Sequence, residues 1–296
     1  MAKQITFHSY KGGSGRSSTT LNTIPYLAEA LGADAEHPIL LLDLDIDSAG
    51  MTYLLGKADH FLNAPDVKVF LKGEIGWRTR STDDFKSHGL LSHFVPVGEK
   101  FGLDNDTVLF FGVNDEKKID NKEIDGTSQD LLHRLGVFAD NNERIKAVVM
   151  DSASGEQTVA NFATQFADTI VCCMRPTMQF RMGTFRFLSH LANAEVSTRI
   201  VLLPTVVPAQ DVEIDGKLQR EDALKKIRRG ISDLEGRIKV DDAFVREDCF
   251  GINEVQRFKW QEGVLYKLEK NGGLTQEDEA LAAHRYKKLA EVLANN

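Results

Sequence analysis

The sequence ITFHSYKGGSGRSSTTLNTIPYLAEAL, residues 5–31, decides the fold of this chain. Its first part, residues 5–8, is short and apolar, which is typical of a buried strand. A glycine-rich segment follows at 11–18, and a helical pattern begins at Ser17. Strand, glycine-rich loop and helix in this order bring several backbone N–H groups and the positive end of a helix dipole to one point. We therefore expect a phosphate-binding site there.

The glycines and hydroxyls of this loop predict how a phosphate chain would be held. Gly12, Gly13 and Gly15 allow the backbone turns and the close approach that a side chain would block. Ser17 stands where a hydroxyl group can reach a Mg²⁺ ion bound to the phosphates. We expect the phosphates to be bound by consecutive loop residues, namely Gly12, Gly13, Ser14, Gly15, Arg16, Ser17 and Ser18.

The loop departs from the common P-loop pattern, G-x-x-x-x-G-K-(S/T). Arg16 stands in the lysine position, and Lys11 stands at the front of the loop. In these respects KGGSGRSS resembles the deviant Walker A motif, KGGxGK(S/T), of the ParA/MinD family within the SIMIBI class of P-loop NTPases. It is still more similar to the KGGVGR-type subgroup, which is often encoded in bacterial conflict and defence loci.

This resemblance implies an ATP-binding protein that uses Mg²⁺ and hydrolyses ATP slowly. The leading lysine of the family, here Lys11, reaches the nucleotide of a second subunit, so the resemblance also implies an ATP-dependent homodimer. Such a dimer would be a nucleotide-dependent switch for a partner protein that the sequence does not identify. Because arginine is bulkier than lysine and differently aimed, we expect Arg16 to support binding but to slow hydrolysis.

Two further motifs carry the same resemblance. LLLDLDIDSAGM, residues 40–51, is similar to the DxDxxxxG segment of the family, and AVVMDSASG, residues 147–155, is similar to its Walker B segment. By this resemblance the catalytic residues would be Lys11, Arg16 and Asp45, with Asp45 orienting the attacking water. The metal site would be formed by Ser17, Asp43 and Asp151.

Each of these aspartates has an alternative interpretation. An aspartate at the end of a strand often caps the turn or helix that follows, and Asp43, Asp47 or Asp151 could have only that role. Parallel strands of an open α/β sheet end at one crevice, however, and ligands bind there. The presence of all three motifs in one chain therefore favours a functional role for Asp45 and Asp151 in particular.

Short apolar runs alternate with longer helical patterns, which predicts an α/β fold with a doubly wound, mainly parallel sheet flanked by helices. We expect strands at residues 5–8, 38–44, 107–113, 145–151, 169–174, 199–203 and 237–240. Helices are expected at residues 17–31, 129–139, 156–166, 178–192 and 219–230.

The length of 296 residues fits a single P-loop NTPase domain, residues 1–296. Two stretches interrupt the alternation and are expected to be insertions, near residues 58–106 and 114–128, the second being too polar to pack. The C-terminal segment, 275–294, repeats apolar residues at helical spacing, so we expect a helix that docks one face on the body. A partner-binding helix would show the same pattern, and that alternative stays open.

Charge and hydropathy limit the class of protein. The chain has 44 acidic and 36 basic residues and a net charge of −8, so nucleic-acid binding would need a local patch and is disfavoured. The best patch, residues 217–229, also contains acidic residues, and a solvated helix face is the simpler interpretation. No apolar run approaches the roughly 20 residues that cross a bilayer, and the N-terminus lacks a secretory signal. We therefore expect a cytoplasmic protein without a transmembrane segment.

Three expectations stay less determined by the residues. By resemblance, the adenine pocket would lie at residues 204–208 and 240–245, although nothing there dictates adenine over guanine. His8, next to the loop, is expected to pack or to face solvent and not to act as a base. Three alternative functions stay open. They are a nucleotide-binding module with little turnover, a DNA-partitioning or membrane-positioning ATPase of the ParA/MinD kind, and a metabolic ATP-dependent ligase or reductase partner on the same fold.

Overall fold

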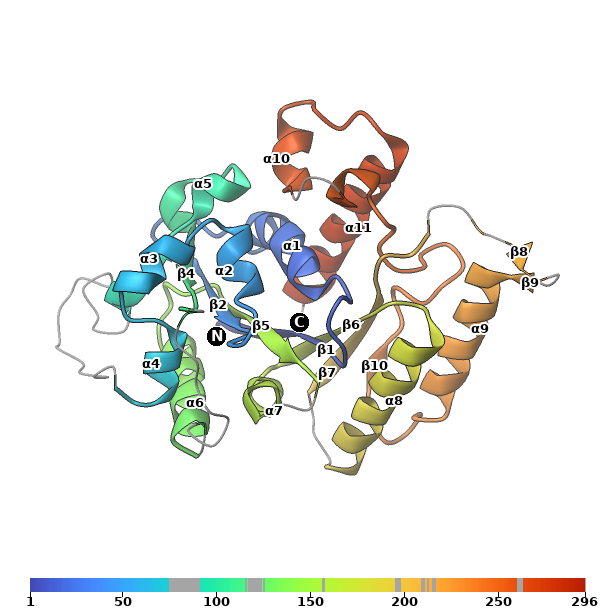
Figure 1. Ribbon diagram of the computed structural model, residues 1–296, viewed down its shortest axis with the longest axis horizontal. Helices are drawn as coiled ribbons and strands as arrows, with labels where there is room; N and C mark the ends of the chain where they lie inside the picture. Colours follow the sequence, from blue (N-terminus) through green and yellow to red (C-terminus); the bar gives the residue numbers. More distant parts are fainter. Residues whose placement is uncertain are drawn as a thin grey trace.

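The computed structural model describes residues 1–74, 91–114, 116, 124, 126–155, 158–194, 198–208, 211, 213–214, 217–259 and 263–295. Within this part of the chain, eight strands form one sheet in the order β10-β7-β6-β1-β5-β2-β4-β3 (Figure 1). The neighbouring strands are parallel except β3 and β4, which are antiparallel. The predicted doubly wound, mainly parallel sheet is confirmed.

The strands follow the expected order along the chain. Those of the main sheet are β1 (Lys3–Ser9), β2 (Ile39–Leu44), β3 (Val95–Pro96), β4 (Val108–Phe111), β5 (Ala147–Ser154), β6 (Thr169–Met174), β7 (Arg199–Pro204) and β10 (Val240–Asp241). A separate two-stranded hairpin is formed by β8 (Glu213–Ile214) and β9 (Lys217–Leu218). The last expected strand, at 237–240, is present but begins only at Val240.

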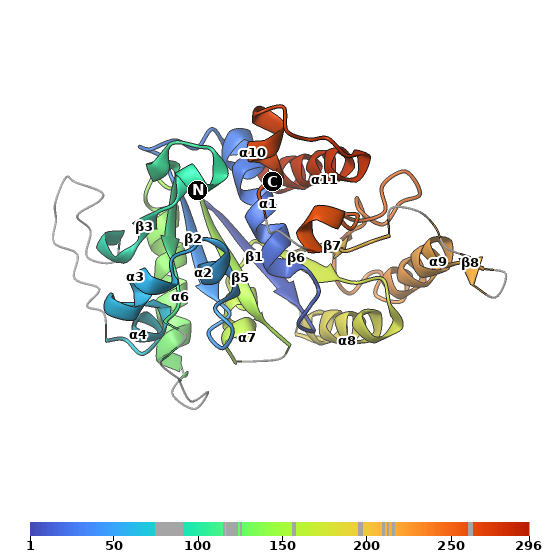
Figure 2. The ribbon, with the colours of Figure 1, turned by 45° about the horizontal axis from the view of Figure 1, so that its top comes forward.

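Helices flank the sheet on both faces, with α1, α10 and α11 on one side and α7 and α8 on the other (Figure 2). The helices are α1 (Arg16–Leu31), α2 (Gly50–Leu54), α3 (Ala58–Asn63), α4 (Val67–Leu71), α5 (Gly98–Phe101), α6 (Gly126–Asp140), α7 (Thr158–Gln165), α8 (Met178–Asn193), α9 (Gln219–Ser232), α10 (Leu265–Lys270) and α11 (Glu277–Ala294). Short 3-10 helices lie at η2 (Leu91–His93), η3 (Asn105–Thr107) and η5 (Gln256–Lys259). Residues 156 and 157, where the third expected helix would begin, lie outside the described residues.

The central strands are apolar because helices cover both of their faces. Every residue of β2 and β6 is buried, and β1 is buried after its first residue. Helix α1 ends at Gly32, whose φ of 61° lets its N–H reach the carbonyls of Ala28 and Glu29. The C-terminal helix α11 packs against α1 and buries Tyr286, Leu289 and Leu293. Its apolar face is thus used within the chain.

The two interrupting stretches have different outcomes. Residues 58–106 contain α3, α4, β3 and α5, while 75–90 lie outside the described residues. Most of 115–125 also lies outside them, but the expectation that 114–128 does not pack is wrong at its ends. Asn114 and Ser128 are buried, the Asn114 N–H donates to Asp66 at 2.7 Å, and the Ser128 hydroxyl donates to the Leu71 carbonyl at 2.8 Å. A single domain over 1–296 stays a prediction.

In the described part of the chain, none of the helices has the length and apolar character needed to cross a membrane.

The strand order brings the carboxyl ends of β1, β5 and β2 to the same edge of the sheet. β5 lies between β1 and β2, and the three strands are parallel. In this register Asp43 of β2 lies beside Asp151 of β5, and Phe7 of β1 lies on the other side of Asp151. The loop that leaves β1 therefore starts close to the carboxylates of Asp43 in β2 and Asp151 in β5.

Candidate functional site

The glycine-rich loop joins β1 to α1 at the edge of the sheet where β2 and β5 also end. Gly13 and Gly15 have φ of 76° and 80°, a left-handed backbone that other residues rarely adopt, so the loop needs glycine at both positions. The loop borders a cavity of about 630 Å³. Residues 12–18, which the sequence predicts to bind phosphate, all line this cavity, as do Asp45, Asp47 and Ser154.

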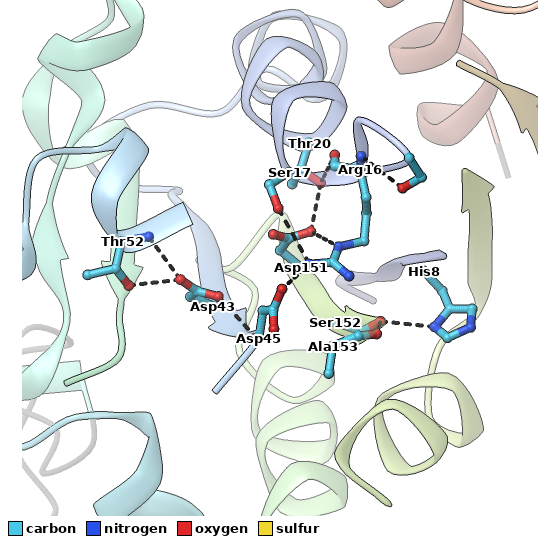
Figure 3. A network of polar contacts seen from close by, with 11 residues as sticks. His8, Arg16, Ser17, Thr20, Asp43, Asp45, Thr52, Asp151, Ser152 and Ala153 are labelled. Carbon is cyan, nitrogen blue, oxygen red and sulfur yellow. Dashed lines mark hydrogen bonds and ion pairs between the residues drawn. The ribbon is translucent and has the colours of Figure 1, made fainter. Parts of the chain in front are cut away.

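Arg16 connects the loop to the carboxylates of Asp45 and Asp151 (Figure 3). Its side chain is only 5% exposed, its Nε donates to Oδ1 of Asp151 at 2.7 Å, and its Nη2 donates to Oδ2 of Asp45 at 2.7 Å. Burial alone would lower the pKa of Arg16, but the charges of Asp151 and Asp45 raise it above its ordinary value. The guanidinium is thus a permanent cation held between the two acids.

Asp151, in β5, is fully buried, and only one of its carboxylate oxygens has hydrogen-bond partners among the described residues. Its Oδ1 also accepts from the Thr20 hydroxyl at 3.3 Å, whereas its Oδ2 is buried and has no hydrogen-bond partner among the described residues. Burial raises the pKa of Asp151, and the nearby Arg16 charge opposes that shift. A buried carboxylate oxygen without a partner needs an explanation, and a hydrated cation beside the loop would supply its missing partner.

Asp43 has a different environment from Asp45, although the two are only two residues apart. Both the N–H and the hydroxyl of Thr52 donate to its Oδ2 at 2.8 Å, and the Asp45 N–H donates to its Oδ1 at 3.1 Å (Figure 3). Burial and then the charge of Asp151 raise the pKa of Asp43 to about 7. These contacts favour the alternative left open by the sequence, in which Asp43 fixes the turn before α2.

Lys11 points away from the carboxylates of its own chain. Its Nζ donates to Oε1 of Gln179 on α8 at 2.6 Å and lies 5.8 Å from the centroid of the Phe180 ring. The side chain is exposed and does not line the loop cavity. A lysine in this place can meet a group outside the chain, but it does not reach Asp45 or Asp151 in this structure.

A second cavity, of about 300 Å³, opens on the other side of Gly15. Thr205 and Val206 line it, whereas residues 240–245 do not, and the adenine pocket at 204–208 and 240–245 stays a prediction. The wall is completed by side chains that the sequence analysis missed, namely Arg175, Ile252, Asn253, Glu254, Val255, Phe258 and Tyr286. No local pattern marks them, because strand pairing and the packing of α11 bring them together from distant parts of the chain.

His8 is a packing residue, as expected. It is buried, its ring centroid lies 4.3 Å from that of Phe187, and its Nδ1 lies 3.1 Å from the Ser152 hydroxyl. Burial, followed by the positive charge of Arg16, lowers the pKa of His8 to about 3. The imidazole is therefore neutral over the physiological range and does not face the loop cavity as a general base.

Three basic side chains of the patch on α9 form ion pairs with acidic side chains of the chain. Lys225 pairs with Glu221 at 2.6 Å, and Arg228 pairs with Glu247 at 3.4 Å. Lys226 forms a further ion pair with Asp222. These contacts agree with the interpretation of this helix as a solvated face.

Comparison with known proteins gives evidence on the fold only. No protein-family model matches the chain, and no curated protein matches its sequence. Solved structures do match in three dimensions. The septum site-determining protein MinD with Mg-ADP, from Pyrococcus horikoshii, superimposes with a TM-score of 0.59 at 16% identity, over 100% of both chains.

Two further structures show how widely this fold is used. A McdA variant from Cyanothece in complex with ATP gives a TM-score of 0.58 at 15% identity, over 99% of this chain and 96% of that one. Cobyrinic acid a,c-diamide synthase from Mycobacterium smegmatis, with ADP and magnesium, gives 0.62 at 15% identity, over 99% and 94%. The chain therefore has the fold of the MinD/ParA-type P-loop ATPases.

Proposed function

We propose that this chain binds ATP with Mg²⁺ in the loop cavity and hydrolyses it slowly. The observation that carries the proposal is the arrangement of one glycine-rich loop opposite Asp45 and Asp151, with Arg16 between them. Phosphoryl transfer depends on positioning and on charge stabilisation, and this site has backbone amides and a buried cation on one side and carboxylates on the other. ATP and Mg-ADP in structures of the same fold support the choice of ligand.

The described residues fit a Mg²⁺ ion that is shared with the nucleotide. They contain no group of three or more His, Cys, Asp and Glu side chains that would hold a metal on their own. Mg²⁺ in nucleotide sites is commonly held by one or two protein groups together with phosphate oxygens. The Ser17 hydroxyl and the unpartnered Oδ2 of Asp151 are the protein groups that we assign to it. The ion would neutralise charge on the phosphates.

The reaction steps that the chain itself performs follow from the contacts of Arg16 and Asp45. The loop amides and Arg16 would bind the phosphates and stabilise the charge of the transition state. Asp45, which is partly exposed to the cavity, would accept a hydrogen bond from the attacking water and orient it. Asp43, whose oxygens are occupied by Thr52 and the Asp45 N–H, would hold this turn in place.

We further propose that two copies of the chain form a nucleotide-dependent dimeric switch. The exposed position of Lys11 supports a role for it toward the nucleotide of a second subunit. Segments 43–50 and 151–155 would change conformation when the γ-phosphate is lost, since both contain carboxylates that face the loop. The dimer would pass this change to a protein partner in the cytoplasm, in a bacterial defence or conflict system if the KGGVGR-type resemblance extends to function.

Isothermal titration calorimetry with Mg-ATP tests the central claim. Wild-type protein should bind Mg-ATP, and Ser17→Ala should retain ATP binding but lose most of its dependence on Mg²⁺. Ser18→Ala, one residue further along α1, is the matched control and should keep the Mg²⁺ dependence. If the wild type showed neither a heat of binding nor a shift of its thermal unfolding midpoint with any nucleoside triphosphate, the proposed function would be wrong.

A positioning ATPase of the MinD or ParA kind is the second candidate, and the shared fold with MinD favours it. The ion pairs on α9 argue against DNA as the surface on which it would act. Titration of ATP-loaded protein with double-stranded DNA at increasing salt separates the candidates. Binding that weakens steeply with salt would favour DNA partitioning, because phosphate contacts release counterions.

A further inference from the structure

Two backbone carbonyls of the phosphate loop accept hydrogen bonds from side chains that follow other strands of the sheet. Arg175 directly follows β6, and its Nε donates to the Gly13 carbonyl at 2.7 Å. Thr205 directly follows β7, and its hydroxyl donates to the Ser14 carbonyl. Two consecutive peptide units of the loop, 13–14 and 14–15, are therefore each fixed by a side chain from a distant part of the chain.

These two contacts also fix the direction of two N–H groups of the loop. The peptide bonds of the described residues are trans, and in a planar trans peptide the C=O and the N–H point in opposite directions. Arg175 and Thr205 line the second cavity and not the loop cavity. The carbonyls of Gly13 and Ser14 thus point away from the loop cavity, which leaves the N–H groups of Ser14 and Gly15 on its side.

A loop of this composition needs such contacts if it is to be ordered before a ligand arrives. Glycine loses more backbone freedom on ordering than any other residue, and the loop contains Gly12, Gly13 and Gly15. A loop that became ordered only when phosphate bound would lose affinity to the cost of that ordering. Donors that already point toward the site of negative charge avoid this cost.

Arg175 is the more informative of the two donors, because its side chain is exposed. A single hydrogen bond from an exposed side chain contributes little to the stability of a folded domain. Its guanidinium also does not line the loop cavity, so it does not need to touch the phosphates in order to act on them. What the structure shows for Arg175 is a contact with the loop backbone at Gly13.

We propose that Arg175 is a positioning residue, which acts through the Gly13 carbonyl to hold the Ser14 N–H toward the phosphates of a bound nucleotide. Thr205 does the same for the Gly15 N–H through the Ser14 carbonyl. The inference rests on the proposed function, because it takes the loop cavity as the phosphate site. The role requires an N–H donor at the place of the Arg175 Nε atom and does not require the positive charge.

Two substitutions of Arg175 separate the donor from the charge. Glutamine places an N–H donor as many bonds from the backbone as the Nε of arginine, whereas methionine has a similar length and no donor. Calorimetry is carried out with magnesium tripolyphosphate, which has no base or ribose, and with Mg-ATP. Arg175→Met should weaken the binding of both ligands by the same factor, about fivefold or more, the scale of one lost hydrogen bond. Arg175→Gln should stay within about twofold of wild type for both.

A second arginine supplies the matched control for loss of charge. Arg181, in the first turn of α8, lines neither the loop cavity nor the second cavity. Arg181→Met removes the same charge from the same region and should leave both affinities within about twofold of wild type. Thr205→Val, which removes the other donor, should weaken both ligands as Arg175→Met does, and Thr205→Ser, which keeps the hydroxyl, should restore them.

Thermal unfolding of the same proteins tests for a purely structural role. Because the Arg175 side chain is exposed, the midpoint of Arg175→Met should stay within about 2 °C of wild type. A larger fall of the midpoint that Arg175→Gln does not reverse would make Arg175 an ordinary structural residue and overturn the proposal.

Three binding results would also overturn it. Equal losses in Arg175→Gln and Arg175→Met would show that the charge acts on the ligand directly. A loss for Mg-ATP alone would show that Arg175 contacts the nucleoside. Unchanged affinities in Arg175→Met would show that the loop does not need this contact, and would leave the ATPase proposal intact. A wild type that binds neither ligand would overturn both proposals.

Discussion

The Nη2 atom of Arg16 lies 2.7 Å from Oδ2 of Asp45. The cation that we assign to the phosphates is thus ion-paired with the carboxylate that we assign to the attacking water. Phosphate oxygens and carboxylates compete for the same guanidinium donors. We therefore expect nucleotide binding to draw Arg16 from Asp45 and to make this carboxylate available as an acceptor for water.

Asp45→Ala should separate binding from turnover. Loss of the water-orienting carboxylate should lower the rate of phosphate release by about 100-fold or more. Affinity for Mg-ATP should stay the same or increase, because Asp45 no longer competes with the phosphates for Arg16. A phosphate-release assay and calorimetry on the same preparation check both effects. Equal release rates for variant and wild type would leave the chain as a binding module.

Arg16→Ala should affect stability as well as binding. It would leave the buried Asp151 without its cation, and breaking one side of a buried ion pair typically costs about 3–5 kcal/mol of the free energy of unfolding. Mg-ATP binding should be lost. Arg16→Lys, which keeps the charge but cannot donate to both carboxylates in the same way, should recover most of the Mg-ATP binding and only part of the free energy of unfolding. Denaturant unfolding and calorimetry measure these effects, and unchanged ATP affinity in Arg16→Ala would contradict the role of Arg16.

The strands and the phosphate loop could be predicted because their signals are local. An apolar run such as 39–44 can be stable only as a covered strand, and the glycine cluster that follows β1 needs a turn with positive φ. Because adjacent parallel strands end at the same edge of a sheet, the sequence also predicts that Asp45 and Asp151 lie at one edge. The contacts of Arg16 could not be predicted from the sequence, because side-chain rotamers and burial decide which carboxylate a long side chain contacts.

The second cavity and the environment of Asp43 could not be read from the sequence for the same reason. A β-bridge with Val207 brings Asn253 to the wall of this cavity, and Tyr286 belongs to α11. Neither residue lies near a sequence motif. Asp43 and Asp45 would share a face if β2 continued, but the strand ends at Leu44. The backbone then turns, and the two carboxylates meet different partners.

Asp43→Ala should destabilise the protein without removing its Mg²⁺ dependence. The variant leaves the buried Thr52 N–H and the partly buried Asp45 N–H without their acceptor, and an unsatisfied buried donor costs about 1–3 kcal/mol. Denaturant unfolding should show this loss, whereas the Mg²⁺ dependence of ATP affinity should match that of wild type. A variant of normal stability whose ATP affinity no longer depends on Mg²⁺ would restore Asp43 as a metal ligand.

His8 should make the protein sensitive to acid. Its pKa is lowered to about 3 in the folded state by burial and then by Arg16, whereas an exposed histidine has a pKa near 6.5. Between these values the unfolded chain binds the extra proton, so stability should fall as the pH falls below 6.5, by about 1.4 kcal/mol per pH unit from this group. The difference between wild type and His8→Gln, measured by denaturant unfolding at pH 7, 6 and 5, isolates this contribution. Parallel pH profiles for the two proteins would contradict it.

Lys11→Ala should abolish dimer formation and leave nucleotide binding by the monomer intact. The Lys11 side chain contacts Gln179 and does not line the loop cavity, so its loss removes no contact to a nucleotide bound in the same chain. If Lys11 instead reaches the phosphates of a second subunit, its removal takes a charge-assisted contact from each half of the interface.

Light scattering after size exclusion should show a wild-type dimer only with Mg-ATP and a Lys11→Ala monomer under all conditions. At protein concentrations at which wild type stays monomeric, calorimetry should give the two proteins ATP affinities within about threefold, corresponding to roughly 0.6 kcal/mol. Gln179→Ala, which removes the partner of Lys11 but keeps its charge, is the matched control and should still dimerise. A Lys11→Ala protein that dimerises like wild type would show that the lysine does not act across the interface.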